Sequence, residues 1–232
     1  MAYAKRAPLK KITSPKGIAG PFPKVTEVDD YKGEKAYKAD LILNPEDEGV
    51  AEYLNAIEAA VDSAYDAGIA DLETQLETAK GAKIASLKKT IEELEKHTPI
   101  VDEYADDGSL TGNKIVKFKR KAAGTFQDSG KSWSHVVPVF DSQKGVIPQG
   151  TPVWGGSVLR CQAELMPFCA TGLKKAGVSM RLFAVQILEI NSGSSAAGGD
   201  GFDMEDGYVA SASVDMSSAV EPSVATDEDE DF

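Results

Sequence analysis

The segment between Pro45 and Pro99 constrains the fold most, because it contains no proline and has a helical pattern of apolar residues. Apolar side chains recur there at intervals of three and four, the spacing of an amphipathic α-helix. Asn44-Pro45-Glu46 predicts the helix start, since asparagine is a good N-cap and proline suits the first helical position. Lys80-Gly81-Ala82 predicts a kink or break. The apolar stripe consists of Val50, Leu54, Ile57, Val61, Tyr65, Ile69, Leu72, Leu76, Ile84, Leu87, Ile91 and Leu94.

We therefore expect one long helix or a helical pair over residues 46–97. The spacing is close to a heptad repeat, so a coiled coil is one interpretation. A helix packed on the rest of the domain or on a sister subunit explains the same stripe equally well. The sequence leaves these alternatives open and favours packing over any cofactor role.

After Asp106-Asp107-Gly108-Ser109 the pattern changes to an alternation of period two, which is typical of half-buried strands. A small Greek-key barrel of the OB type would close five or six such strands, because closure removes most exposed edges. The expected fold class is mainly β, an OB-fold with an inserted helical region. The candidate strands are Val25–Val28, Lys35–Leu43, Lys114–Lys121, Trp133–Phe140, Val158–Met166 and Val178–Ile190.

Composition suggests three parts of the chain. Residues 1–20 are basic with little periodicity, which predicts an N-terminal arm. Residues 21–190 are expected to form the OB-fold domain, with residues 46–97 as its insertion. Residues 191–232 are dominated by glycine, serine, alanine and acidic residues. Because such a segment cannot bury enough apolar surface to offset its ordering entropy, we expect a disordered acidic tail.

The net charge of -12 conceals a strong segregation of charge along the chain. Residues 191–232 contain eleven acidic residues and no lysine or arginine, whereas residues 110–190 contain eleven basic and four acidic residues. Residues 41–109 are acidic, with seventeen acidic and five basic residues. A basic module within an acidic chain indicates that the barrel binds a polyanion.

The strand candidate Lys114–Lys121 places Lys117, Lys119 and Lys121 on one face, with Val116 and Phe118 on the other. Lys114 and Arg120 lie at its ends. A row of lysines can simply blunt a solvated edge strand. Within a strongly basic module, contact with phosphate is the favoured interpretation.

Further candidates come from the later strands and loops. Arg160 points outward from a strand whose other face is apolar, and Arg181 shares a face with Phe183. Nucleic-acid bases stack on exposed rings, and Trp154 and Phe168 are favoured because they lie at junctions of loops and strands. The other candidate rings are Tyr37, Phe126, Trp133 and Phe183. The predicted contacts with DNA are Lys35, Lys114, Lys117, Lys119, Arg120, Lys121, Trp154, Arg160, Phe168 and Arg181.

The sequence argues against an enzyme, a metal site and a cofactor. Gly124 to Ser132 resembles a phosphate-binding P-loop, but five residues separate the glycines where four are required, and a strand follows. We interpret it as a hairpin turn. Cys161 and Cys169 suit neither a disulfide framework nor a zinc site, and His135 has no catalytic partner nearby. With only these two cysteines, a reducing cytoplasm is the expected compartment. No apolar run is long enough to span a bilayer, so we expect no membrane contact.

The last residues form an acidic run that ends in an aromatic ring. A flexible anionic segment with a terminal ring suits docking into a basic groove that has an apolar pocket, either in this chain or in a partner. The residues of this predicted docking segment are Asp227, Glu228, Asp229, Glu230, Asp231 and Phe232.

Several segments carry a family resemblance in their order along the chain. They are Tyr37-Lys-Ala-Asp-Leu41, Val116-Lys-Phe-Lys119, Thr125-Phe-Gln-Asp128, Phe140-Asp-Ser-Gln-Lys144, Gly155-Gly-Ser157, Leu165-Met-Pro-Phe168, Gly207-Tyr-Val-Ala-Ser211 and the acidic end with its terminal phenylalanine. Together they resemble the replication single-stranded DNA-binding proteins of short-tailed lytic bacteriophages, over nearly the whole chain from about Tyr37.

The resemblance implies an OB-fold, commonly a homodimer, that coats single-stranded DNA during replication, recombination and repair in the infected bacterial cell. It implies that the tail recruits the phage DNA polymerase and primase-helicase and competes with DNA for the groove. Lys119 matches a groove lysine, Phe168 a stacking aromatic and Phe232 the docking ring of the tail. Lys121 stands where the family has an aromatic residue. The alternative is a structural protein that oligomerises through residues 46–97, with the tail serving only solubility.

Overall fold

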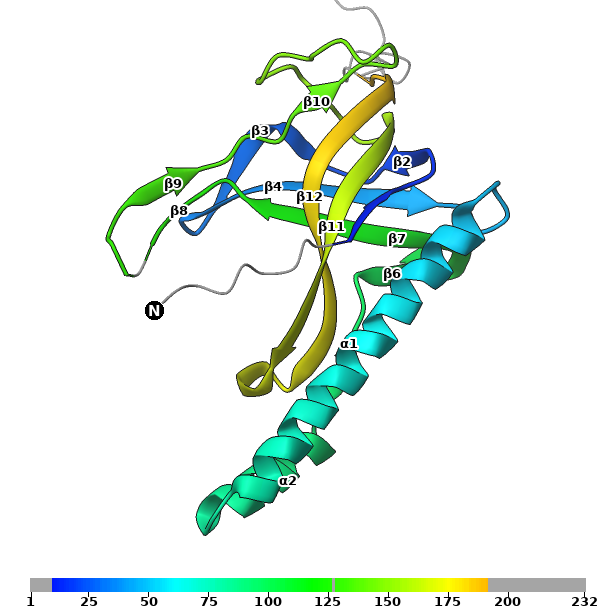
Figure 1. Cartoon of the computed structure of the whole chain (residues 1–232). Helices are drawn as coiled ribbons and strands as arrows, with labels where there is room; N and C mark the ends of the chain where they lie inside the picture. Colours follow the sequence, from blue (N-terminus) through cyan, green and yellow to red (C-terminus); the bar gives the residue numbers. More distant parts are fainter. Residues whose placement is uncertain (1–9, 127, 192–232) are drawn as a thin grey trace, which may run out of the picture. The chain divides into compact units, whose positions relative to one another are not determined.

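A computed structural model describes residues 10–126 and 128–191 of the chain. Figure 1 shows these residues as strands wrapped around one another, with a long helix beside them (Figure 1). The elements in chain order are β1 Lys11–Thr13, β2 Gly17–Ala19, β3 Lys24–Tyr31, β4 Glu34–Leu43, α1 Val50–Thr78, α2 Ala82–Glu92, β5 Glu95–His97, β6 Ile100–Tyr104, β7 Leu110–Lys121, β8 Ala123–Thr125, β9 Ser132–Ser134, β10 Val139–Phe140, β11 Val158–Ala170, the 3₁₀ turn η1 Thr171–Leu173 and β12 Lys175–Glu189.

Five of these strands close into a barrel. The pairings run β11–β2–β4–β7–β12 and return from β12 to β11, so that each barrel strand has two neighbours. The β7–β12 pairing is parallel and the other four are antiparallel. This is the five-stranded OB-type closure that the sequence predicts, and the mainly β fold class is confirmed. The remaining strands of this sheet each pair with one barrel strand: β1 with β11, β3 with β4, β6 with β7, and β5 and β10 with β12.

Alternation of side chains along each strand forms the core. In β4, Ala39, Leu41 and Leu43 are buried, and in β7 Val116 and Phe118 point the same way. In β11 the buried set is Leu159, Cys161, Ala163 and Leu165, as the period of two predicts. The opposite face of β7, β11 and β12 is therefore left for polar and charged side chains.

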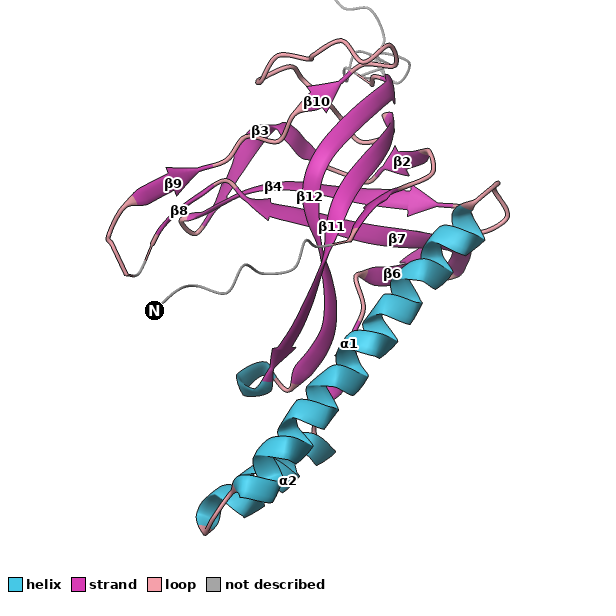
Figure 2. Cartoon of the chain, in the orientation of Figure 1, coloured by secondary structure: helices cyan, strands magenta, loops and turns pink. Residues whose placement is uncertain are grey.

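The helical insertion forms a pair, and its apolar stripe packs within the chain. The first half of α1 contributes Val50, Tyr53, Leu54, Ile57 and Val61 to the barrel core. The second half packs with α2 and β12 through a separate cluster of Leu72, Leu87, Leu94 and Ala176. Figure 2 shows α1 beside the long β11–β12 hairpin (Figure 2). A Cβ at Gly68 would lie 3.2 Å from Cys169 Sγ, so glycine there permits a close approach of helix and hairpin.

The predicted helix start at Asn44-Pro45-Glu46 is wrong. Asn44 Oδ1 accepts a hydrogen bond from the Glu46 backbone N–H and forms a local turn, and α1 begins only at Val50. Gly49 precedes α1 with a φ of 75°, a left-handed conformation that favours glycine. Asparagine before proline is a turn signal as well as a capping signal, and here the turn prevails.

Other predicted boundaries also change. The single strand Trp133–Phe140 is wrong, because β9 and β10 are separated by a segment that contains Pro138, which has no N–H to donate. The last three residues of the predicted helical region form β5. Part of the predicted basic arm forms the short strands β1 and β2. The tail, residues 191–232, lies outside the described residues from residue 192 onward.

Candidate nucleic-acid interface

A groove of about 670 Å³ crosses the outer face of β7 and β12, and we call it the basic groove. β7 is the third barrel strand, and the second and third strands form the nucleic-acid-binding face of OB-folds. The groove is also lined by residues of β4, β9, β11 and the β5–β6 segment. Its lining residues are Glu34, His97, Thr98, Pro99, Val101, Lys117, Lys119, Arg120, Lys121, Trp133, His135, Met166, Ser179, Met180 and Arg181.

Three lysines of β7 form one side of the basic groove. Lys117, Lys119 and Lys121 are exposed, and they alternate with the buried residues on the opposite face of the strand. Lys119 Nζ lies 3.1 Å from Glu34 Oε1, and Lys121 Nζ lies 3.8 Å from the same oxygen. The hydrogen bond from Lys119 lowers the pKa of the Glu34 carboxyl, so this side chain is an anion held between two groove cations.

Two arginines add positive charge to the groove. The pairing of β7 with β12 sets Arg181 opposite Lys119. Arg181 Nε donates to Glu164 Oε2 at 2.7 Å, which fixes the guanidinium on the face of the sheet. Arg120 donates to the Leu182 carbonyl oxygen at 3.3 Å. Partial burial, followed by repulsion from Arg181, lowers the pKa of Arg120, although a guanidinium remains charged at neutral pH.

Aromatic side chains line the same groove. The Trp133 ring lies 5.0 Å from His135 and 6.5 Å from Phe126, measured between centroids. A Cβ at Gly124 would lie 2.5 Å from the indole, so the ring rests directly on the backbone of β8. The predicted hairpin turn between Gly124 and Ser132 is confirmed by the antiparallel pairing of β8 with β9. This hairpin positions Trp133 in the groove.

A second aromatic pair joins the groove through His97. Its ring lies 5.4 Å from the Phe168 ring, at an interplanar angle of 60°. Burial, followed by the charge of Lys175, lowers the pKa of His97, which keeps the imidazole neutral at neutral pH. Phe168 does not line the groove itself. Its ring contacts a residue that does.

Half of the predicted contact residues therefore gather in the basic groove: Lys117, Lys119, Arg120, Lys121 and Arg181. The structure places the other half elsewhere. Lys114 forms an ion pair with Asp102 across β6 and β7, and Lys35 lies 4.0 Å from Asp30. Trp154 is 49% exposed in the loop before β11. Arg160 lines a separate pocket on β11 and β12.

Sequence reasoning missed some of the groove. Trp133 is one candidate ring among six, and its local sequence favours it less than Trp154, which lies at a junction of loop and strand but outside the groove. His97 lay at the end of a segment predicted to be helical, and nothing in its surroundings points to a groove. Glu34 carried no signal, because an acidic residue within a basic site becomes visible only when its two lysine partners are placed beside it.

Two general features of the described residues bear on function. None of their helices combines the length and the apolarity that crossing a lipid bilayer requires. Their histidine, cysteine and acidic side chains form no cluster suited to a metal ion. The predicted docking residues 227–232 are not among those that the structure describes.

The chain is similar to single-stranded DNA-binding proteins of bacteriophages. The family model "Single-stranded DNA-binding protein, Bacteriophage T7" matches residues 16–190. The crystal structure of gp2.5, a single-stranded DNA-binding protein encoded by bacteriophage T7, is 23% identical with a TM-score of 0.65, and the match covers 88% of this chain and 100% of that one. The structure of the single-stranded DNA-binding protein from bacteriophage Enc34 in complex with ssDNA is 13% identical with a TM-score of 0.43. This match covers 78% of this chain and 87% of that one.

No curated protein is detectably similar to the chain by sequence comparison. The family model, however, spans well over half of the chain and nearly all of the described residues. The likeness to the T7 protein supports the same fold. The chain belongs to the bacteriophage T7 single-stranded DNA-binding protein family.

Proposed function

We propose that the basic groove is where this chain binds single-stranded DNA, without sequence preference and without catalysis. The observation that carries the proposal is the convergence of Lys117, Lys119, Lys121 and Arg181 with Trp133 in one groove. Single-strand binders need cations that follow the phosphate backbone and rings on which successive bases stack. The groove supplies both on one face of the barrel.

In this proposal the lysines of β7 contact phosphates, and Trp133 stacks on a base. Stacking tolerates any base, because every base has a π face. Arg181 is held by Glu164, so it presents a fixed positive charge beside Lys119. Entering phosphates displace Glu34 from Lys119, because two anions compete for the same ammonium group.

A charge reversal tests the proposal. Lys119→Glu should weaken binding to a fluorescein-labelled oligo-dT by more than about tenfold, because one contact is lost and a repulsion is added. The matched control is Lys83→Glu on α2, which should change affinity by less than about twofold. Binding of a duplex of the same length is measured in parallel. Equal affinities of the Lys119 and Lys83 variants for the single strand would overturn the proposal.

We further propose the role of a phage replication protein in the cytoplasm of the infected bacterium. Sequence-independent coating of exposed single strands serves replication, recombination and repair alike. The acidic residues 227–231 with Phe232 would dock on the phage DNA polymerase and primase-helicase, and would compete with DNA for the basic groove. The support is the segregation of charge between the basic barrel and the acidic tail.

Removal of residues 212–232 tests the role of the tail. The truncated chain should bind oligo-dT more tightly than the full chain, because an intramolecular competitor is gone. It should no longer bind the polymerase in a pull-down with purified proteins. Equal DNA affinity of both chains would contradict competition, and retained polymerase binding would contradict recruitment through the tail.

A homodimer is the expected assembly, and sedimentation of the full chain tests it. The helix-mediated scaffold is the weaker alternative. Its main support was the apolar stripe of residues 46–97, and that stripe packs on the barrel and on α2 within one chain.

A further inference from the structure

A second pocket lies on the same outward face of β11 and β12, beyond the basic groove. It has a volume of about 270 Å³, and we call it the Arg160 pocket. This volume is just under the roughly 300 Å³ at which pockets for small molecules begin, so it suits one planar group. The lining residues that bear on its chemistry are Thr13, Phe140, Lys144, Arg160, Gln162 and Gln186.

Lys144 belongs to a hydrogen-bonded turn at the edge of this pocket. Asp141 Oδ1 accepts hydrogen bonds from the backbone N–H groups of Gln143 and Gly145, at 2.9 and 2.7 Å. Gln186 Nε2 donates to the carbonyl oxygens of Asp141 and Ser142, which ties the turn to β12. Lys144 has a φ of 69°, a strained conformation for a residue with a side chain. Such strain is typical of positions where the surroundings fix a functional residue.

The two cations of the pocket differ from Lys119 and Arg181 of the groove in their partners. Lys119 and Arg181 in the groove each pair with a carboxylate. Within residues 10–126 and 128–191, neither Lys144 nor Arg160 forms an ion pair. Two cations that form no ion pair in the described residues, beside a half-buried ring, make a site for an anion that carries a flat group. A nucleotide has that chemistry.

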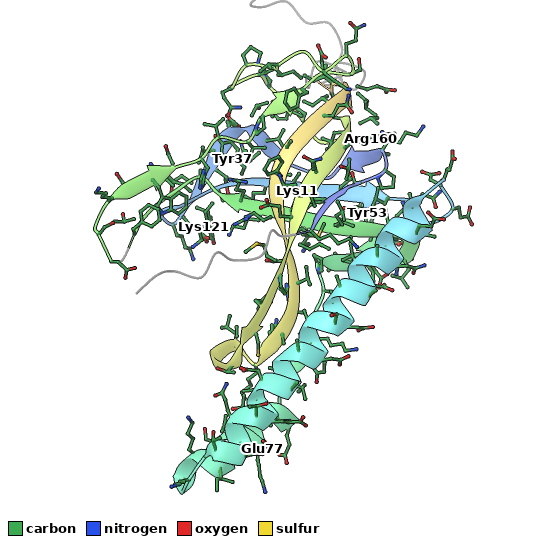
Figure 3. All side chains as sticks on the ribbon, viewed as in Figure 1. Lys11, Tyr37, Tyr53, Glu77, Lys121 and Arg160 are labelled. Atoms are coloured by element: carbon green, nitrogen blue, oxygen red, sulfur yellow. The ribbon has the colours of Figure 1, made fainter. Side chains whose placement is uncertain are left out.

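Contacts across β1, β11 and β12 connect the two pockets. The groove ends at Arg181, which pairs with Glu164 on β11. Next along β12, the Phe183 ring lies 3.5 Å below Lys11 Nζ. Gln162 Nε2 then donates to Thr13 Oγ1 at 3.3 Å, and both residues line the Arg160 pocket. Figure 3 shows the labelled Lys11 between Lys121 and Arg160 in this view (Figure 3).

We propose that the Arg160 pocket is a second subsite for the same DNA strand that occupies the basic groove. One base lies against Phe140, and the flanking phosphates contact Lys144 and Arg160. The proposal rests on the proposed function of the groove. From Glu164 to Arg160, β11 advances by about 13 Å at ~3.3 Å per residue, which about four nucleotides span at the stacked spacing of ~3.4 Å. A strand must therefore be several nucleotides longer than the groove to reach this subsite.

The test compares oligonucleotides of two lengths. Oligo-dT of about 4 and about 16 nucleotides covers the range of OB-fold site sizes. The double variant Lys144→Gln, Arg160→Gln should bind the long oligonucleotide about tenfold more weakly at low salt, and the short one within about twofold. Its salt slope with the long oligonucleotide should fall by about 1.4, because a single-strand contact contributes about 0.7. The control double variant Lys83→Gln, Lys88→Gln on α2 removes the same charge and should behave like wild type.

A second measurement does not depend on variant proteins. Acetylation of Lys144 in the wild-type chain, followed by mass spectrometry, should be suppressed by the long oligonucleotide and not by the short one. Equal acetylation with both, together with an unchanged affinity of the Lys144, Arg160 variant, overturns the second subsite. If the second subsite is overturned in this way but Lys119→Gln weakens binding of both oligonucleotides, the proposed function of the groove is unaffected. If Lys119→Gln also has no effect, the proposed function of the groove fails as well.

Discussion

Trp133 provides the sharpest test of stacking in the basic groove. Its ring rests on the backbone at Gly124 and lies 5.0 Å from His135, so it is already oriented before DNA binds. Trp133→Ala removes this platform and no charge. β8 and β9 form a two-stranded sheet of their own, so the substitution should leave the barrel folded, which far-UV circular dichroism and thermal melting check.

The expected loss follows from the surroundings of the ring. Stacking of a base on an aromatic side chain contributes about 1–3 kcal/mol by alanine substitution. Because the indole already rests on the β8 backbone, one base can stack on its free side, and we expect about 1–2 kcal/mol. This corresponds to a loss of roughly 5- to 30-fold in affinity for oligo-dT. The slope of log K against log salt should not change, since no phosphate contact is lost.

Intrinsic fluorescence assigns the effect to one ring. The chain has two tryptophans, Trp133 and Trp154. Trp154→Phe leaves only the groove indole, and DNA should quench its fluorescence as fully as in the wild type. Trp133→Phe leaves only the loop indole, and DNA should have little effect on its emission. Quenching that survives in Trp133→Phe and disappears in Trp154→Phe would refute the stacking assignment.

Three further predictions concern charge, packing and thiols. Glu34→Gln should tighten oligo-dT binding about two- to fivefold at pH 7, because an anion that competes for Lys119 is removed. This difference between variant and wild type should vanish as the pH falls below the lowered pKa of the Glu34 carboxyl, because the protonated side chain of the wild type is then as neutral as the amide of the variant. Gly177→Ala should loosen the β5–β12 pairing, because a Cβ would overlap the His97 carbonyl oxygen, and hydrogen exchange should accelerate in β5. Under native conditions a thiol reagent should modify Cys169 only, since burial raises the pKa of Cys161, and both thiols should react in denaturant.

The strands that sequence predicts well are those defined by local alternation. β4, β7, β11 and β12 all contain long in-and-out patterns, so their faces follow from the residues themselves. The common face of Lys117, Lys119 and Lys121 is predictable for the same reason. β1 and β2 have three residues each, which is too short for any period to emerge, so the sequence predicts only a basic arm there.

The composition of the groove depends on long-range pairing. Arg181 lies beside Lys119 only because β12 pairs with β7 in one particular register, and no local pattern specifies that register. Lys114 belongs to the same strand as the groove lysines, but it has the opposite side-chain parity to them and pairs with Asp102. Trp133 enters the groove because a hairpin places it there. Such positions follow from tertiary structure, which sequence periodicity does not contain.

The most direct test of the central claim is the salt dependence of oligo-dT binding after removal of the three groove lysines. The variant Lys117→Gln, Lys119→Gln, Lys121→Gln is compared with Lys80→Gln, Lys83→Gln, Lys88→Gln, which removes the same charge from α2 and the turn before it. Each single-strand phosphate contact contributes about 0.7 to the slope of log K against log salt. The groove variant should therefore have a slope shallower by about 2.1, equivalent to an about 18-fold smaller loss of affinity between about 50 and 200 mM salt. The control should match wild type. Equal slopes for both variants would contradict the assignment of the groove as the DNA-binding site.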